Sequence, residues 1–140
     1  MNRRKAWVIL ASVAIVILCI TSPMMLRAWQ EYRAAERVFD DFADAQTKGE
    51  LQRAYSFCSP DFKAVTAYTE FVRQQTVLKS AYGSLKSIRR RSVIVEGHGS
   101  PTTWTAVINA TLTFEKQQAH FVYEFHKQNG PWELDGSQQR

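Results

Sequence analysis

An uncharged, apolar run close to the N-terminus constrains this chain more than any other feature. The run begins at Ala6 and ends at Leu26, which is 21 residues without a charge. About 20 apolar residues in a helix cross the hydrocarbon core of a bilayer. A helix also satisfies its backbone hydrogen bonds within the segment, as lipid requires. The sequence therefore predicts a tail and transmembrane helix over residues 1–27, followed by a separate domain over residues 28–140.

Two other interpretations of this run stay open. A cleaved signal peptide also has a basic start and an apolar stretch, but the nearest approach to a small-x-small cleavage site, "ITSP", places a proline just after the cut. A lipoprotein would use Cys19, but the preceding "VIL" lacks the small residue usual before a lipidated cysteine. An uncleaved signal-anchor helix is favoured over both.

The basic residues of the chain are unevenly placed. The chain has 18 Lys and Arg against 13 Asp and Glu, a net charge of +5, and Arg3, Arg4 and Lys5 directly precede the apolar run. Basic residues in short tails stay in the cytoplasm, so the N-terminus is expected there and the domain outside, in the periplasm or beyond the cell. The remaining charges nearly balance, and no nucleic-acid partner is expected.

The first part of the domain has the periodicity of helices. Apolar residues recur at three-and-four spacing over residues 28–48, and Gly49 follows in the usual helix-stop position. A short second helix is predicted over residues 50–57. Pro60 then interrupts the pattern, and a loop is expected there. A third helix is predicted over residues 69–83.

After this helix the apolar period changes to two. Strands are predicted over residues 85–96, 102–115 and 119–127, and a last strand opens with Trp132. The turn "GHGSP" joins the first two strands, and the "NG" dipeptide, a strong hairpin signal, joins the last two. Helices that precede an antiparallel sheet indicate an α+β fold. We expect three helices packed on a curved antiparallel sheet of about four strands.

With these elements, the domain resembles the nuclear-transport-factor-2-like superfamily, which has a cystatin-like fold. It is most similar to small membrane-anchored bacterial members of unknown function. The segments that carry the resemblance are "KGELQRAYSFCSPDF", "TEFVRQQTVLKSAYGSLKSI" and "FVYEFHKQNGPWELDG". The resemblance implies a curved sheet wrapped by helices into a cone, often with a pocket and often dimeric through the sheet.

The superfamily includes isomerases, dehydratases, binding modules and secretion-system assembly domains, and a fold does not choose among them. Its enzymes commonly carry a Tyr and Asp, or a His and Asp, inside the cone. Neither pair matches positions of this chain, so no catalytic residue is carried over. The inward positions instead predict a filled core or an apolar pocket. Its candidate lining residues are Phe39, Phe42, Phe71, Trp104, Ile108 and Leu112.

Two histidines and a glutamate share one face of a predicted strand. At about 3.3 Å per residue, His120 and His126 lie roughly 20 Å apart along the strand, so one metal ion cannot bind His120, Glu124 and His126 together. An acid–base pair of Glu124 and His126 is geometrically possible. A solvated face or a protein interface is favoured, because the neighbouring strand presents a threonine-rich polar face.

The first strand contains a run of three arginines. These protect an exposed edge strand by their charge, or they form a docking patch for anionic lipid headgroups or an acidic partner. We treat this run and the polar face together as a candidate interface. Its residues are Arg89, Arg90, Arg91, Thr111, Thr113, His120, Glu124 and His126.

These features favour a membrane-anchored, extracytoplasmic binding or assembly module that acts through its sheet face, without catalysis, cofactor or metal. Its expected partners are the membrane and a second copy or an envelope protein. One alternative is a small apolar-ligand site, or an isomerase- or dehydratase-like enzyme, in the cone pocket. Another is a subunit of an envelope or secretion complex.

Overall fold

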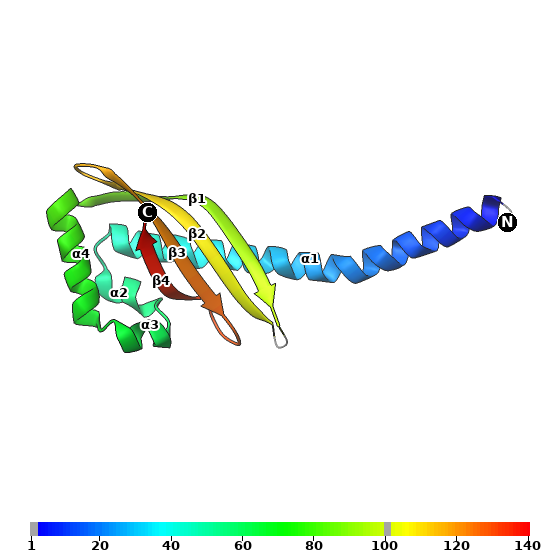
Figure 1. Cartoon of the computed structure of the whole chain (residues 1–140), viewed down its shortest axis with the longest axis horizontal. Helices are drawn as coiled ribbons and strands as arrows, with labels where there is room; N and C mark the ends of the chain where they lie inside the picture. Colours follow the sequence, from blue (N-terminus) through cyan, green and yellow to red (C-terminus); the bar gives the residue numbers. More distant parts are fainter. Residues whose placement is uncertain (1–2, 100–101) are drawn as a thin grey trace.

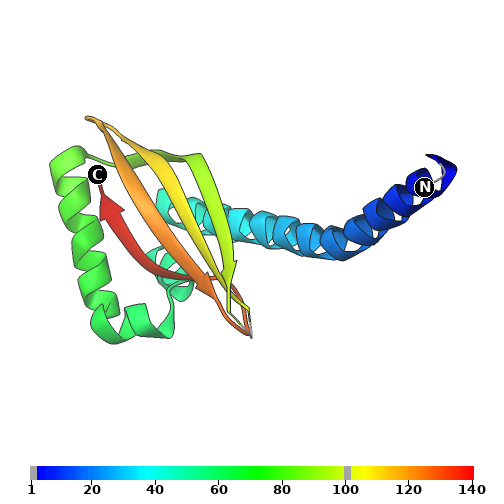
Figure 2. The same ribbon diagram turned by 45° about the vertical axis from the view of Figure 1, so that its right-hand side comes forward.

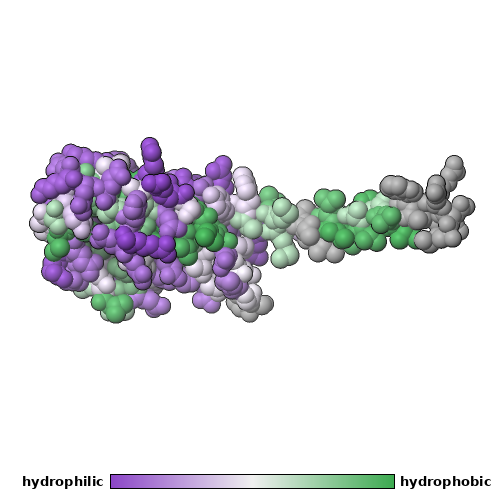
Figure 3. Space-filling model, turned by 45° about the horizontal axis from the view of Figure 1, so that its top comes forward, coloured by the Kyte–Doolittle hydropathy of each residue, from purple (hydrophilic) through white to green (hydrophobic). Residues whose placement is uncertain are grey.

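A single long helix leads from the N-terminus into the domain. The computed structural model describes residues 3–99 and 102–140, so the expected turn residues Ser100 and Pro101 lie outside the described residues. Helix α1 (Arg3–Thr47) has 45 residues, roughly 65 Å at 1.5 Å per residue. Its first part projects from the domain as a stalk with an apolar surface (Figures 1 and 3). The helix continues without a break from the apolar run into the domain.

The stalk has the properties of a membrane span. Within the stretch Ile9–Thr47, its most apolar window has a mean hydropathy of 2.4 and none of that window is buried. The chain therefore contains one helix near the N-terminus that is long and apolar enough to cross a membrane, although a signal sequence has the same composition.

Four antiparallel strands form one open sheet. They are β1 (Leu85–His98), β2 (Thr103–Phe114), β3 (Gln118–Lys127) and β4 (Glu133–Gln139). Each pairs with the next, in the order β1-β2-β3-β4, and the sheet is twisted and curved (Figure 2). The helices of the described residues cover one face of this sheet, which confirms the expected α+β architecture.

The second part of α1 crosses the covered face, and three shorter helices follow it: α2 (Leu51–Ser56), α3 (Pro60–Val65) and α4 (Tyr68–Tyr82). The loop expected after Pro60 is wrong, because α3 forms there. Proline is favoured in the first turn of a helix, where its missing N–H is not needed. Ser59 caps this helix, and its hydroxyl accepts a hydrogen bond from the Phe62 N–H at 3.0 Å.

An aromatic seam joins α1 to the sheet. Phe39 and Phe42 project from successive turns of α1 and meet Tyr123 and Phe125 on the inner face of β3. All four ring pairs make edge contacts, with centroids 5.4 to 6.3 Å apart. Phe39, Phe42 and Phe125 are essentially fully buried. This seam occupies the middle of the sheet.

Charged contacts tie α1 to the end of β3 and to β1, on the same face of the sheet. Glu31 accepts hydrogen bonds from Lys127 Nζ at 2.8 and 2.9 Å, and from the indole N–H of Trp132 at 3.2 Å. Arg90 of β1 pairs with Glu36 and Asp40. These contacts hold the domain at one angle to the stalk.

Replacing Glu31 tests the first of these contacts. We expect Glu31→Ala to lower the free energy of unfolding by about 2 kcal/mol, because it leaves a half-buried ammonium and an indole N–H without their acceptor. Urea denaturation of the purified chain measures the change. The matched control is Glu50→Ala, whose pair with Arg53 is solvent-exposed and should contribute far less. Equal losses in the two variants would contradict the prediction.

Candidate functional site: a cleft beneath the last helix

Helix α4 is attached to the rest of the domain at its two ends. Near its start, the ring of Phe71 lies 5.4 Å from that of Tyr55 in α2. At its end, the ring of Tyr82 lies 5.4 Å from that of Phe114 in β2. Between these two attachments the helix spans an open space, so it forms the roof of a cleft.

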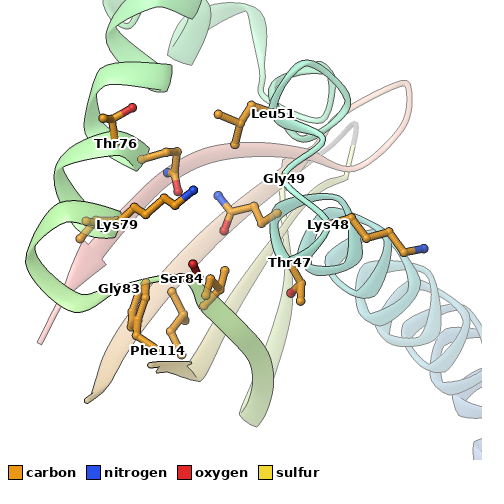
Figure 4. Close-up of a pocket in the computed structure, with 14 residues that line it drawn as sticks. Thr47, Lys48, Gly49, Leu51, Thr76, Lys79, Gly83, Ser84 and Phe114 are labelled. Carbon is orange, nitrogen blue, oxygen red and sulfur yellow. The ribbon is translucent and has the colours of Figure 1, made fainter. Parts of the chain in front are cut away.

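The cleft has two lobes that meet under the middle of α4. The larger lobe, of about 560 Å³, lies between α4, the inner face of the sheet and β4. The smaller lobe, of about 390 Å³, lies between α4, the end of α1 and the start of β1 (Figure 4). The residues that line both lobes are Gln46, Gln75, Leu78 and Leu112.

Aromatic and aliphatic side chains make up much of the wall of the larger lobe. They come from α1, α3, α4 and three strands, and they are Phe42, Phe62, Phe71, Leu78, Leu112, Phe121 and Leu134. Ligand sites in proteins are typically apolar clefts of this size with a few placed polar groups.

Two polar side chains are buried in this apolar wall. Gln46 is 8% exposed and Tyr123 is 3% exposed, and both line the larger lobe. Among the described residues, neither the Gln46 carboxamide nor the Tyr123 hydroxyl has a hydrogen-bond partner. Burial raises the pKa of the Tyr123 phenol above its ordinary value, so the hydroxyl is protonated at neutral pH and available as a donor. Among the described residues, the Trp104 indole nitrogen is the only fully buried side-chain polar atom without a partner, so the polar atoms of Gln46 and Tyr123 are open to the cleft. Both groups are therefore available as contacts for a bound molecule.

A glycine fixes the narrow end of the smaller lobe. Gly83 joins α4 to β1 with a φ of 82°, a conformation that favours glycine. A Cβ atom at this position would lie 2.8 Å from the side chain of Glu115. The chain can therefore turn tightly from the roof into the sheet only with glycine here.

The six expected pocket residues divide between the cleft and the core. Phe42, Phe71 and Leu112 line the cleft. The other three are packed between α1 and the sheet, and they are Phe39, Trp104 and Ile108. The space expected against the middle of the sheet is filled by the aromatic seam, and the cleft lies beside it.

On the outer face of the sheet, the polar groups bind one another. His126 hydrogen-bonds to Thr105 Oγ1 through Nε2 at 3.1 Å, and its Nδ1 donates to the carboxylate of Asp135. Glu124, on the same face, is exposed and forms no part of this group. Asp135 also borders the larger lobe, but its carboxylate is engaged by the imidazole.

A second group of this kind surrounds Thr111. Its hydroxyl accepts a hydrogen bond from Arg91 Nε at 3.0 Å and contacts His120 Nδ1 at 3.1 Å. Thr111 is 6% exposed as a result, while Thr113 beside it is half-buried. The three arginines alternate about a bulge in β1. Arg90 turns to α1 and pairs there, and Arg89 is exposed.

Sequence reasoning missed Gln46, although a signal was present. Residues 35, 39 and 42 mark the apolar stripe of α1, and the same spacing continues to position 46. A carboxamide in a position that the stripe assigns to the core is a local inconsistency, and such inconsistencies gather at functional sites.

Cys58 is the one thiol of the domain. It is fully buried, as expected for a small apolar side chain. Burial raises the pKa of its thiol to about 11, so it is protonated at neutral pH and a poor nucleophile.

Comparison with known proteins gives a fold but no family. No protein-family model matches the chain, and no curated protein matches it. Among solved structures, the chain is similar to Bd1075 of Bdellovibrio bacteriovorus, with a TM-score of 0.56 and 14% sequence identity. The match covers 76% of this chain and 39% of that protein, so this chain corresponds to well under half of its length. At this identity the likeness concerns the fold alone.

Two tyrosines make a matched test of the cleft. The Tyr55 hydroxyl donates to the Thr66 carbonyl at 2.8 Å, so we expect Tyr55→Phe to lower the free energy of unfolding by about 1 kcal/mol. Tyr123→Phe loses no hydrogen bond to the protein, and we expect a change smaller than about 0.5 kcal/mol, or a gain. Thermal or urea unfolding measures both. A larger loss for Tyr123→Phe than for Tyr55→Phe would show that its hydroxyl has a partner within the protein.

Proposed function

We propose that this chain is a membrane-anchored module whose domain binds a small, largely apolar molecule in the cleft beneath α4. The observation that carries the proposal is a pair of polar side chains, Gln46 and Tyr123, that line a 560 Å³ lobe with aromatic walls and have no hydrogen-bond partner among the described residues. A ligand with an apolar body and one or two hydrogen-bonding groups would satisfy both side chains.

The cleft is favoured over the sheet face because the two surfaces differ in hydrogen bonding. On the outer face, Thr105, Thr111 and the two histidines already have partners. In the cleft, Gln46 and Tyr123 have none within the part of the chain that the structure describes. An empty binding site has polar groups that lack hydrogen-bond partners until the ligand binds, and the cleft has such groups.

The proposal includes a cellular location. The apolar part of α1 serves as an uncleaved signal-anchor, with the basic N-terminal tail in the cytoplasm and the domain in the periplasm or outside the cell. The fold supports membership of the nuclear-transport-factor-2-like superfamily, with the cleft as the cone pocket moved towards α4.

The test is a screen of small aromatic and aliphatic molecules against the full chain in lipid nanodiscs. Leu78 lines both lobes, so Leu78→Trp should fill the space where they meet. We expect ligands of the wild-type protein to bind this variant at least roughly tenfold more weakly. Ala81→Trp, at an exposed position of α4 that lines neither lobe, is the control and should bind as the wild type does.

Either of two results would contradict the proposal. One is a screen in which no molecule binds the wild-type chain. The other is a set of ligands whose affinity is the same for the wild type and for Leu78→Trp, since these molecules would bind outside the cleft.

The outer face of the sheet is the second candidate, because the described helices leave it uncovered (Figures 1 and 2). It carries Arg89 and Arg91 on β1, and Glu124 and Glu133 on β3 and β4. In a second copy related by a two-fold axis, the glutamates would face these arginines and the arginines would face these glutamates. In this case the face pairs two copies of the chain.

A charge in the middle of this face tests the pairing. We expect Thr111→Lys to convert a dimer to a monomer in light-scattering measurements, because it places an ammonium against Arg91 and the partner surface. Lys116→Glu, a charge change at an exposed position of the β2–β3 turn, is the control. An unchanged mass in Thr111→Lys would end this second candidate and leave the cleft unaffected.

A further inference from the structure

The smaller lobe of the cleft contains one lysine whose charge has no partner. Lys79 extends from α4 into the space between α4 and the end of α1, whereas Lys48 points away from it (Figure 4). The ammonium of Lys48 is bound to Asp44 at 2.9 Å. No ion pair of Lys79 occurs among the described residues.

The carboxylates near this lobe are already engaged. Asp44 binds both Lys48 and Arg53. Glu115, close to Gly83, binds Lys86 at 2.9 Å and accepts a hydrogen bond from the Ser84 N–H at 3.1 Å. Within residues 3–99 and 102–140, no Asp or Glu lines the smaller lobe. Glu115 is close enough to Lys79 for their charges to interact, but the two form no ion pair. The lobe therefore presents an exposed ammonium without a direct ion-pair partner.

The position of the cleft also restricts where its ligand comes from. The apolar run ends at Leu26, and Gln46 lines the cleft 20 residues further along the same helix, roughly 30 Å at 1.5 Å per residue. Figure 1 shows α4 at the end of the domain opposite the stalk. If the stalk lies in a membrane, the cleft opens well above the lipid headgroups and takes molecules from the water.

We propose that the ligand is a water-borne amphipathic carboxylate. Its carboxylate binds Lys79 in the smaller lobe, and its apolar body lies in the larger lobe against Phe42, Phe71 and Leu112. Gln46, which lines both lobes, contacts the polar end where they meet. This inference rests on the proposed function of the cleft and adds the charge class of its ligand.

The experiment uses two probes of nearly equal shape, naphthylacetate and naphthylacetamide, which differ in charge. Each is titrated calorimetrically into the full chain in nanodiscs of neutral lipid, with empty nanodiscs as the blank. We expect the wild-type chain to bind the carboxylate roughly tenfold more tightly than the amide, as a charge-assisted hydrogen bond contributes more than a neutral one. Lys79→Gln should lower the affinity for the carboxylate to that for the amide and leave the amide unchanged.

Lys116→Gln is the matched control. It removes the same charge from an exposed turn, and Lys116 lines neither lobe, so it should bind both probes as the wild type does. Replacing part of the neutral lipid with an anionic lipid should also leave both affinities unchanged. A loss of naphthylacetate binding in those discs would show that a lipid headgroup occupies the site, and would overturn the water-borne source.

The remaining outcomes separate the two proposals. If both probes bind equally and Lys79→Gln changes neither affinity, while Leu78→Trp weakens both, the cleft binds ligands without selecting an anion. The proposed function then stands and this inference is overturned. If neither probe binds, this inference also fails, and the wider screen decides whether the cleft binds anything. If the carboxylate binds but Lys79→Gln and Lys116→Gln weaken it equally, the attraction is a general one and Lys79 has no special role.

Discussion

The aromatic seam between α1 and β3 is the contact on which the rest of the domain depends. Phe39 and Phe42 lie one turn apart on the helix and meet Tyr123 and Phe125, two residues apart on the strand. A helix that crosses a sheet at its middle leaves little room between them there. The open space between the helices and the sheet is therefore displaced to the end of α1, where α2 to α4 turn back and α4 spans the gap.

The helix that forms this seam also forms the apolar stalk, so the core of the domain is rigidly connected to the apolar segment. Glu31 ties α1 to the end of β3 and Glu36 ties it to β1, both within about three turns of the end of the apolar run. A helix with no break and two lateral ties transmits its orientation to the domain. The end with the cleft then stands away from the stalk, and the β2–β3 turn lies at that same end, near α4 (Figure 1).

Much of this architecture follows from the sequence, because its signals are local. The alternation along β2, the "NG" hairpin and the stop at Gly49 are each readable from a few neighbouring residues. The helix after Pro60 was missed because proline both ends and begins helices, and the capping bond of Ser59 is visible only in three dimensions. The cleft was only half predicted. The apolar stripe on α1 includes both Phe39 and Phe42. Only the path of α4 in the folded domain determines that Phe42 borders the cleft and that Phe39 lies in the core.

Gln46 shows why the site is harder to predict than the fold. Leucine at this position would bury more apolar surface, so the carboxamide contributes less to stability than an apolar side chain would. Proteins retain such side chains where a function uses them, and the loss in stability is offset by the well-packed seam one turn earlier on the helix. The unmatched ammonium of Lys79, across the cleft from the end of α1, fits the same account. Both groups are open to water in the empty cleft, and a ligand that pairs with them would replace this water with a hydrogen bond and a charged contact.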